Sequence, residues 1–501
     1  MRAWGDSLPM GRDGSYRSAT AIAAAIREGE RSALSVIEAT FDRIEARNEA
    51  TNAFCTIAPD RARESARDVD RAIAAGETVG PLAGVPIGVK DLIDVAGMRT
   101  TYGSMAFAEH TPERSALVVS RLEAAGAVIV GKTNTPEFGR KPMTSNLLFG
   151  TTANPWNTDR TAGGSSGGSA AALADGLVPL ALGTDAAGSL RVPSSACGTY
   201  ALVPEFGRIA RGPASTRTDA FVPIQPYGHV GPMSRTVADT ALALDVLAGP
   251  HPADPHSLPE QPAAEPYREV VRSIEDDQPL DGLDIAYSPD LGIGRYEEGI
   301  GRTVADAVET FEAAGADVSS IESVFEDSWQ TLFEALSTLL QVRYAGLYDD
   351  LGRNAGIDLL DPGPEVEITG EVTSRIAKAM EVSAIDFKRA ERVRTSAYDA
   401  IQDVFERYDL LCTPLLTTVP FPKDTEPTAI DGEAIHPLHG WHLAWPLNLT
   451  GNPAASLPAG FVDELPVGLQ VIGPRRADEW VLRASAVFER ERSWRDAYPP
   501  R

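Results

Sequence analysis

The sequence predicts an α/β fold in which helices cover a mostly parallel sheet. From about residue 80, short apolar segments typical of strands alternate with helical patterns, at 85–89, 127–130, 177–183, 285–287 and 409–412. One unit, a helix that ends at a glycine and leads into a strand, occurs as LEAAGAVIV at 122–130 and as FEAAGADVS at 311–319. Such alternation favours parallel pairing. With 501 residues, 43% of them hydrophobic, the chain can bury a large core.

Residues 18–48 are expected to form two helices ahead of the sheet. Ser35 and Glu38 have the spacing of a capping box, which predicts a helix start there. Apolar residues then recur at helical spacing on one face, namely Val36, Ile37, Thr40, Phe41 and Ile44. This face is predicted to pack against the core.

The sheet is expected to begin where Val85, Ile87 and Val89 alternate with smaller residues. Ser115 is then expected to begin a helix that Gly126 ends, and AVIV follows as a strand.

Stretches rich in proline and glycine at 249–266 and 418–440 flank a segment with a stronger helical pattern. Within it, Ser383 is expected to cap a long helix that runs to about Arg407. We interpret this segment as a substrate-facing insertion within one domain.

Composition and charge narrow the possible partners. The formal net charge of −26 argues against nucleic acid and against an anionic membrane surface, which would both repel the chain. Cys55, Cys197 and Cys412 lie far apart, so neither a disulfide framework nor a cysteine metal site is indicated. The first residues, MRAWGDSLPMGRDGS, lack the apolar core of a signal peptide, and a cytoplasmic protein is predicted.

Two motif-like segments match nucleotide-binding and esterase patterns only superficially. GAVIVGKT at 126–133 fits the P-loop pattern, but AVIV favours the strand itself where a glycine loop is needed. GxSxG occurs twice, centred on Ser165 and Ser166, but a nucleophile elbow follows a strand, and NPWNTDRTA is a run of turn formers.

HPLHGWH at 436–442 spaces three histidines by three residues, as a metal site could. Pro437 and Gly440 break the helix that would align them, so no metal is predicted. A loop lining a pocket, with Trp441 and Trp445 nearby, is preferred.

Two further segments each allow a catalytic and a plain interpretation. GTDAAGSLR at 183–191 has small residues whose backbone N–H groups could converge as an oxyanion hole, or could form a tight turn. Lys90 ends an apolar strand, where burial would lower its pKa and make it a base, or it could lie in a surface turn.

Together these segments resemble the amidase signature family of serine hydrolases. The resemblance covers most of the chain and is densest in PLAGVPIGVKDLID (81–94), GKTNTPEFG (131–139), NPWNTDRTAGGSSGGSAAA (154–172), GTDAAGSLRVPSSACG (183–198), GPMSRTVADTA (231–241), LTGNPAASLPAGF (449–461) and PVGLQVIGP (466–474). It implies a single large domain over 1–501 with a twisted mixed sheet between helices. Its expected parts are N-terminal helices (about 1–65), a catalytic core (about 66–245 and 440–501) and a variable substrate-facing segment (about 246–439).

The resemblance implies a catalytic triad of Lys90 as base, Ser165 as proton relay on a cis peptide, and Ser189 as nucleophile. It also implies an oxyanion hole made by the backbone N–H groups of Ala186, Ala187, Gly188 and Ser189. Asp185 and Arg191 are expected to pair behind this turn. Tyr102, Trp441 and Trp445 are predicted either to line an apolar substrate pocket or to lie in the core.

The function so implied is that of an amidase, which hydrolyses linear amides and could also cleave carbamates, as a urethanase does, or esters, through an acyl-enzyme. No cofactor or metal is expected, the substrate is a small molecule, and a homodimer is possible. One alternative is the glutamine amidase subunit of a tRNA-dependent amidotransferase, and another is an inactive binding protein of the same fold. Two departures from the family pattern are Ala187, where a glycine is frequent, and ALVPE at 201–205.

Overall fold

The computed structural model describes the chain outside residues 1–17, 213–226, 260–264, 275–277 and 501. The expectation about a signal peptide concerns residues outside the described part. No helix in the described ranges is long and apolar enough to cross a membrane.

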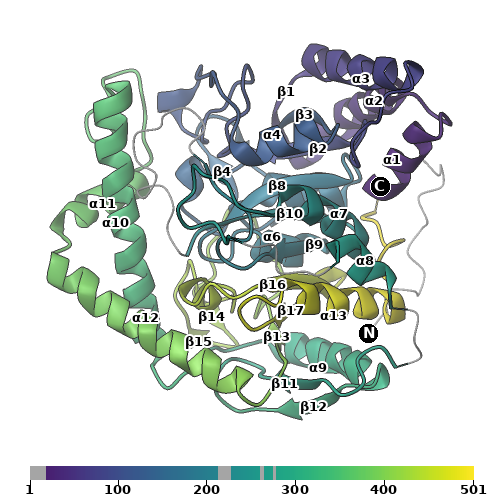
Figure 1. The fold of residues 1–501 in the computed structure, drawn as a ribbon. Coiled ribbons are helices and arrows are strands. Elements are labelled where there is room, and N and C mark those ends of the chain that lie inside the picture. The colour runs from purple at the N-terminus through teal and green to yellow at the C-terminus, as the bar shows by residue number, and fades with distance from the viewer. Residues whose placement is uncertain (1–17, 213–226, 260–264, 275–277, 501) are drawn as a thin grey trace.

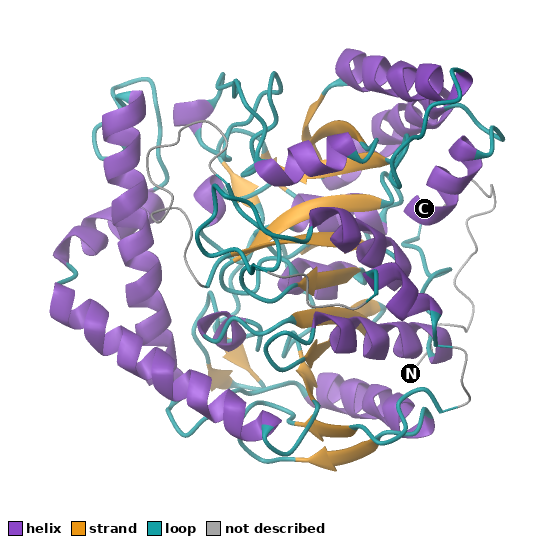
Figure 2. Ribbon diagram, viewed as in Figure 1, coloured by secondary structure: helices purple, strands orange, loops and turns teal. Residues whose placement is uncertain are grey.

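An 11-stranded sheet runs through the whole molecule (Figure 2). Its strands, in spatial order, are β1 (Phe54–Ile57), β3 (Val128–Thr133), β2 (Pro86–Lys90), β8 (Leu180–Asp185), β10 (His229–Ser234), β9 (Tyr200–Val203), β16 (Ala454–Val462), β17 (Leu465–Ile472), β13 (Leu410–Pro414), β11 (Asp284–Tyr287) and β12 (Asp317–Ser320). Three separate hairpins are formed by β4 (Ser145–Asn146) with β5 (Gly150–Thr151), β6 (Ala153–Asn154) with β7 (Asn157–Thr161), and β14 (Ala429–Ile430) with β15 (Glu433–Ala434).

The sheet is mixed, as the family resemblance implies, and the expectation of a mostly parallel sheet is wrong. Parallel pairing joins β3 to β2 to β8, and β13 to β11 to β12, whereas the other described neighbours are antiparallel. One cause is the β16–β17 hairpin, whose two-residue turn holds Asp463 and Glu464 at φ of 50° and 63°. Such turns usually contain Asn-Gly or Asp-Gly, so these residues carry no hairpin signal.

Helices cover this sheet (Figure 2). They are α1 (Ala19–Arg27), α2 (Ala33–Thr51), α3 (Pro59–Ala74), α4 (Leu117–Ala124), α5 (Gly167–Ala174), α6 (Arg191–Cys197), α7 (Val237–Leu247), α8 (Tyr267–Arg272), α9 (Glu298–Ala313) and α13 (Asp478–Glu491), with the 3₁₀ turns η1 (Met105–Phe107), η2 (Glu137–Gly139) and η3 (Trp445–Leu449). The helix–glycine–strand unit recurs as predicted, as α4 followed by β3 and as α9 followed by β12.

Three further helices, α10 (Trp329–Ala355), α11 (Gly370–Glu381) and α12 (Ala384–Phe405), form a separate layer at the left of Figure 1. Ser383 caps α12 through a capping box with Asp386, which confirms the predicted start of that helix. The segment 246–439 is not only an insertion, however, because it also supplies β11, β12 and β13 to the main sheet.

The N-terminal helices are confirmed, with one correction. The predicted apolar face of α2 is buried, including Val36, Ile37 and Ile44. The cap of α2 is Ser32, whose hydroxyl accepts the N–H of Ser35, so the helix begins three residues before the predicted capping box. Ser32 has the same hydroxyl that made Ser35 a candidate, and the sequence alone did not separate them.

Candidate active site

Lys90 is the last residue of β2, between β3 and β8. Its amine donates hydrogen bonds to Ser165 Oγ at 2.7 Å, Ser166 Oγ at 2.9 Å and Thr184 Oγ1 at 3.0 Å. Its side chain is completely buried, which excludes the surface-turn interpretation. The structure thus places the predicted base beside the predicted relay.

Burial lowers the pKa of Lys90 well below its usual value, because the ammonium form loses its hydration. The charge of Asp185 opposes this shift, and that of Arg343 adds to it. Asp185 is committed to Arg191, so no ion pair restores the charge of Lys90. A neutral amine among hydroxyl groups can accept a proton, as a general base must.

The glycine–serine stretch, GGSSGG at 163–168, forms a tight, buried turn that leads directly into α5. The Gly164–Ser165 peptide is cis, as the family resemblance implies. A Cβ at residue 164 would lie 2.7 Å from the backbone of Met143, so only glycine fits there. This turn presents Ser165 to Lys90.

The predicted nucleophile lies on the turn between β8 and α6. The carboxylate of Asp185 organises this turn by accepting hydrogen bonds from the N–H groups of Gly188 at 2.8 Å and Leu190 at 3.0 Å. The guanidinium of Arg191 donates to the same carboxylate through Nε at 3.1 Å and Nη2 at 3.0 Å. The Asp185–Arg191 pairing is therefore confirmed.

Arg191 is in turn bound by two residues that sequence reasoning missed. Its Nη1 donates to Gln470 Oε1 at 2.7 Å and its Nη2 donates to Asn448 Oδ1 at 2.6 Å. Burial alone would raise the pKa of the Asp185 carboxyl, but the charge and hydrogen bonds of Arg191, with the hydrogen bonds from Asn448 and the Leu190 N–H, lower it well below its usual value. Gln470 lies within the PVGLQVIGP segment of the family resemblance, but the resemblance assigned no role to it.

The predicted oxyanion hole needs a correction. The N–H of Gly188 donates to Asp185, so it is not available to an oxyanion in this geometry. Among the described residues, the N–H groups of Ala186, Ala187 and Ser189 have no hydrogen-bond partner. Gly188 is needed for shape, because its φ is +97° and a Cβ would lie 2.7 Å from Ala444 Cβ. Sequence alone could not show which N–H groups the carboxylate takes.

Ser189 is half-buried, and its hydroxyl makes no hydrogen bond to a described residue. Its carbonyl oxygen accepts the N–H of Ser166 at 3.1 Å, which fixes the nucleophile turn against the cis-serine turn. Proton transfer to Ser165 therefore requires the two hydroxyls to come closer than they are here. Ser166 and Thr184, whose hydroxyls also bind Lys90, were given no catalytic or positioning role from the sequence.

The three predicted pocket residues have different environments. Trp441 and Trp445 are buried, at 1% and 0% exposure, and each belongs to an apolar cluster, as the core alternative requires. Tyr102 is half-buried and its hydroxyl donates to Asp94 Oδ1 at 2.7 Å. Of the histidines in HPLHGWH, His439 and His442 are hydrogen-bonded at 3.1 Å. No group of three metal-ligating side chains comes together within the described ranges.

Neither the segment that fits the P-loop pattern nor the GxSxG segment forms the site that its pattern describes. AVIV enters β3 and Lys132 lies inside that strand, donating to Ile93 O at 2.6 Å and Thr100 Oγ1 at 2.8 Å, so no phosphate loop exists there. A short strand, β7, does precede the serines, contrary to the expectation of turns alone. It belongs to a small hairpin outside the main sheet and thus does not form a nucleophile elbow.

Comparison with known proteins places this geometry among relatives. The family model described as Amidase matches residues 35–482. The chain is 36% identical to an acylamidase of Rhodococcus erythropolis, over 97% of each chain. It is also 36% identical to a glutamyl-tRNA(Gln) amidotransferase subunit of Geobacillus kaustophilus (strain HTA426), over 95% of this chain and 97% of that one.

Solved structures agree with these sequence matches. A bacterial aryl acylamidase of the amidase signature enzymes family superposes with a TM-score of 0.89 at 34% identity, covering 96% of this chain and 97% of that one. A 6-aminohexanoate cyclic dimer hydrolase superposes with a TM-score of 0.83 at 31% identity, covering 97% of this chain and 99% of that one.

Proposed function

The chain belongs to the amidase family and is a hydrolase of amide C–N bonds, and on that premise we propose that Lys90, Ser165 and Ser189 carry out its reaction. The observation that carries this assignment is the buried amine of Lys90, which lies 2.7 Å from Ser165 Oγ. The N–H of the next residue, Ser166, is hydrogen-bonded to the carbonyl oxygen of Ser189, so the turn that carries Ser165 is held against the turn that carries Ser189.

In the proposed reaction, neutral Lys90 accepts a proton from Ser165 while Ser165 accepts one from Ser189. Ser189 Oγ attacks the carbonyl carbon of the amide, and the carbonyl oxygen becomes negatively charged. The free N–H groups of Ala186, Ala187 and Ser189 stabilise that charge.

The protonated Lys90 then returns the proton through Ser165 to the leaving nitrogen, and the C–N bond breaks. Water, deprotonated by the same relay, attacks the remaining ester on Ser189, which regenerates the serine and releases a carboxylic acid.

For the substrate, we propose small amides that include aryl amides, because relatives named acylamidase and aryl acylamidase match over nearly the whole chain. Carbamates and esters pass through the same kind of tetrahedral intermediate, so urethanase activity is proposed as well. We further propose a metal-independent, cytoplasmic enzyme that can form a homodimer and binds neither nucleic acid nor membrane.

The Ser189→Ala variant tests this assignment. We expect loss of 4-nitroanilide hydrolysis and of labelling by a fluorophosphonate probe, with an unchanged circular dichroism spectrum. Near-normal turnover by the folded variant would contradict the role of Ser189. Failure of the folded wild type to react with the probe would favour an inactive binding protein.

A second candidate function is supported by the relatives named as glutamyl-tRNA(Gln) amidotransferase subunits. Purified protein supplied with glutamine, aryl amides or carbamates distinguishes the two, because the amidase assignment predicts turnover of amides without any partner protein. Glutamine hydrolysis alone, and only after addition of the other amidotransferase components, would favour the second candidate.

A further inference from the structure

Helix α10 is joined to the catalytic turn through Tyr227. The hydroxyl of Tyr227 donates to the carbonyl oxygen of Leu339 at 2.8 Å, and its own carbonyl oxygen accepts Asn448 Nδ2 at 3.1 Å. Asn448 also donates to Asp185 at 2.8 Å. In a helix the carbonyl of residue 339 lies beside the N–H of residue 343, so this contact brings Arg343 to the same side.

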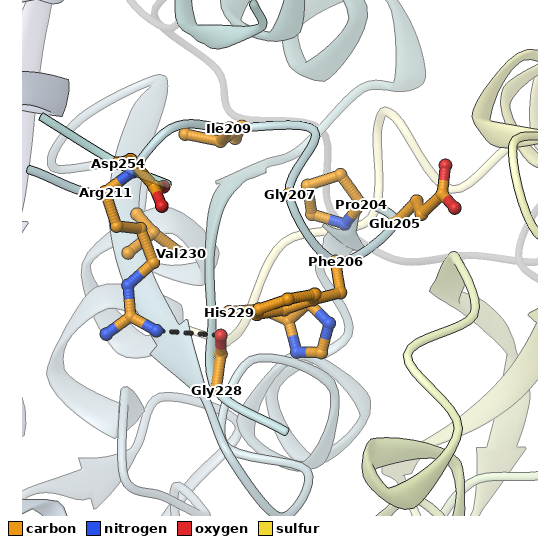
Figure 3. A pocket seen from close by; sticks show the side chains of 10 residues that line it. All are labelled: Pro204, Glu205, Phe206, Gly207, Ile209, Arg211, Gly228, His229, Val230 and Asp254. Atoms are coloured by element: carbon orange, nitrogen blue, oxygen red, sulfur yellow. Dashed lines mark hydrogen bonds between the residues drawn. The ribbon is translucent and has the colours of Figure 1, made fainter. Parts of the chain in front are cut away.

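Arg211 approaches the same place from the other direction. Its backbone N–H donates to Asp254 Oδ2 at 2.7 Å, but its guanidinium points away from that carboxylate and donates Nη1 to Gly228 O at 2.8 Å (Figure 3). Gly228 lies between Tyr227 and His229, and His229 is paired with Asp185 in the sheet. The guanidinium therefore lies near the end of β8, where the nucleophile turn begins.

Neither arginine has an ion-pair partner among the described residues, in contrast to Arg191, Arg208 and Arg353. Burial is the main cause of the pKa shifts of Lys90, Arg211 and Tyr227, and the charge of the exposed Arg343 lowers each of these pKa values. Burial and the charge of Arg343 lower the pKa of Arg211 to about 10, against the opposing effect of Asp254. Two cationic side chains thus approach Tyr227, Arg343 from the helix turn that accepts its hydroxyl and Arg211 through the neighbouring Gly228.

The chain has a net charge of −26, so acidic groups that could pair with these two arginines are abundant. The net negative charge of the protein repels an anion at long range. A local pair of guanidinium groups without carboxylate partners would attract that anion once it is close. A bound carboxylate would relieve their mutual repulsion, and the planar guanidinium suits a carboxylate well.

We propose that Arg343 and Arg211 bind a carboxylate of the substrate, so that the preferred amides carry a negative charge away from the scissile bond. This inference rests on the proposed function and names its substrate class. The carboxylate can belong to the acyl part or to the amine part, and the two sources are separated by experiment.

The test uses two matched pairs of amides at low ionic strength. In the acyl pair, the 4-nitroanilide of adipic acid with one free carboxylate is compared with hexanoyl 4-nitroanilide. In the amine pair, 4-acetamidobenzoate is compared with 4-acetamidotoluene, with product followed by chromatography. The measured quantity is the ratio of kcat/KM for the charged amide to that for the neutral amide.

We expect the wild type to favour the charged amide in one pair by about tenfold or more, mainly through a lower KM. The Arg343→Gln variant should reduce this ratio by about tenfold, and Arg343→Lys should retain part of it. The matched control is Arg353→Gln, on the same helix but ion-paired to Asp349 at 2.8 Å, which should leave the ratio unchanged.

Equal ratios for wild type and Arg343→Gln, or a wild type that favours neither charged amide, would overturn this proposal while the amidase assignment stands. No hydrolysis of either member of either pair by the folded wild type would instead contradict the proposed function. The pair that shows the preference identifies which side of the scissile bond bears the carboxylate.

Discussion

Replacing Lys90 by arginine is the sharpest test of the proposed mechanism. The amine of Lys90 is held by three hydroxyl groups and has no carboxylate partner in the part of the chain that the structure describes, so its value as a base depends on being neutral. A guanidinium stays protonated at every working pH and cannot accept a proton from Ser165. General-base catalysis contributes about 10²–10⁴-fold, which corresponds to about 3–5 kcal/mol of activation free energy. We expect Lys90→Arg to lose at least that factor in kcat/KM.

The pH dependence of kcat/KM tests the same role of Lys90 as a neutral base. Protonated Lys90 is inactive, and burial lowers its pKa, so kcat/KM should rise with pH through an apparent pKa below that of free lysine, about 10.4, and stay high above it. The assay measures the release of 4-nitroaniline from an anilide substrate across about pH 5–10, a range that includes the pH values at which proteins tend to be most stable.

Lys132 offers a matched control, because it is also completely buried, in the neighbouring strand β3, but contacts no proposed catalytic residue. Lys132→Met should lower the melting temperature and leave the apparent pKa of kcat/KM in place. If Lys90→Arg keeps most of the activity, or if the apparent pKa moves in Lys132→Met alone, Lys90 is not the base.

Three further outcomes are expected. Ser165→Ala should reduce kcat/KM by about 10²-fold or more because it interrupts the proton path, and an intact rate in the folded variant would exclude the relay. Gly188→Ala should destabilise the fold by about 1–3 kcal/mol, measured by urea denaturation, because φ is +97° and the Cβ meets Ala444; unchanged stability would show that the turn adapts. Dialysis against a strong chelator should leave the rate unchanged, whereas loss of activity that zinc restores would revive a metal role for His436, His439 and His442.

The elements predicted from sequence are those fixed by local patterns. β2, the helix–glycine–strand units and the Ser383 cap follow from apolar spacing and capping chemistry within a few residues. Lys90, Ser165 and Ser189 were assigned as catalytic because each lies in a contiguous segment that the family resemblance marks.

The features that were missed depend on distant contacts. The N–H of Gly188 is hydrogen-bonded to Asp185, whose carboxylate is oriented by Arg191. Arg191 is in turn positioned by Gln470 and Asn448. No local spacing encodes such a network. The antiparallel centre of the sheet was missed for a related reason, since strands β9 and β16 are neighbours in space but distant in sequence.

The place of the β16–β17 hairpin has a consequence for how the protein matures. These are the last strands of the sheet to leave the ribosome, yet they lie in its middle, between β9 and β13. A nascent chain therefore carries two sheet fragments with open edges, and Arg191 lacks its bond to Gln470, until residues 454–472 are made. Ser189 is synthesised long before the strands near Arg191 are complete, so we expect a chain that ends before residue 454 to be inactive and prone to aggregate. Completion of this hairpin joins the two open edges and supplies Gln470 to Arg191.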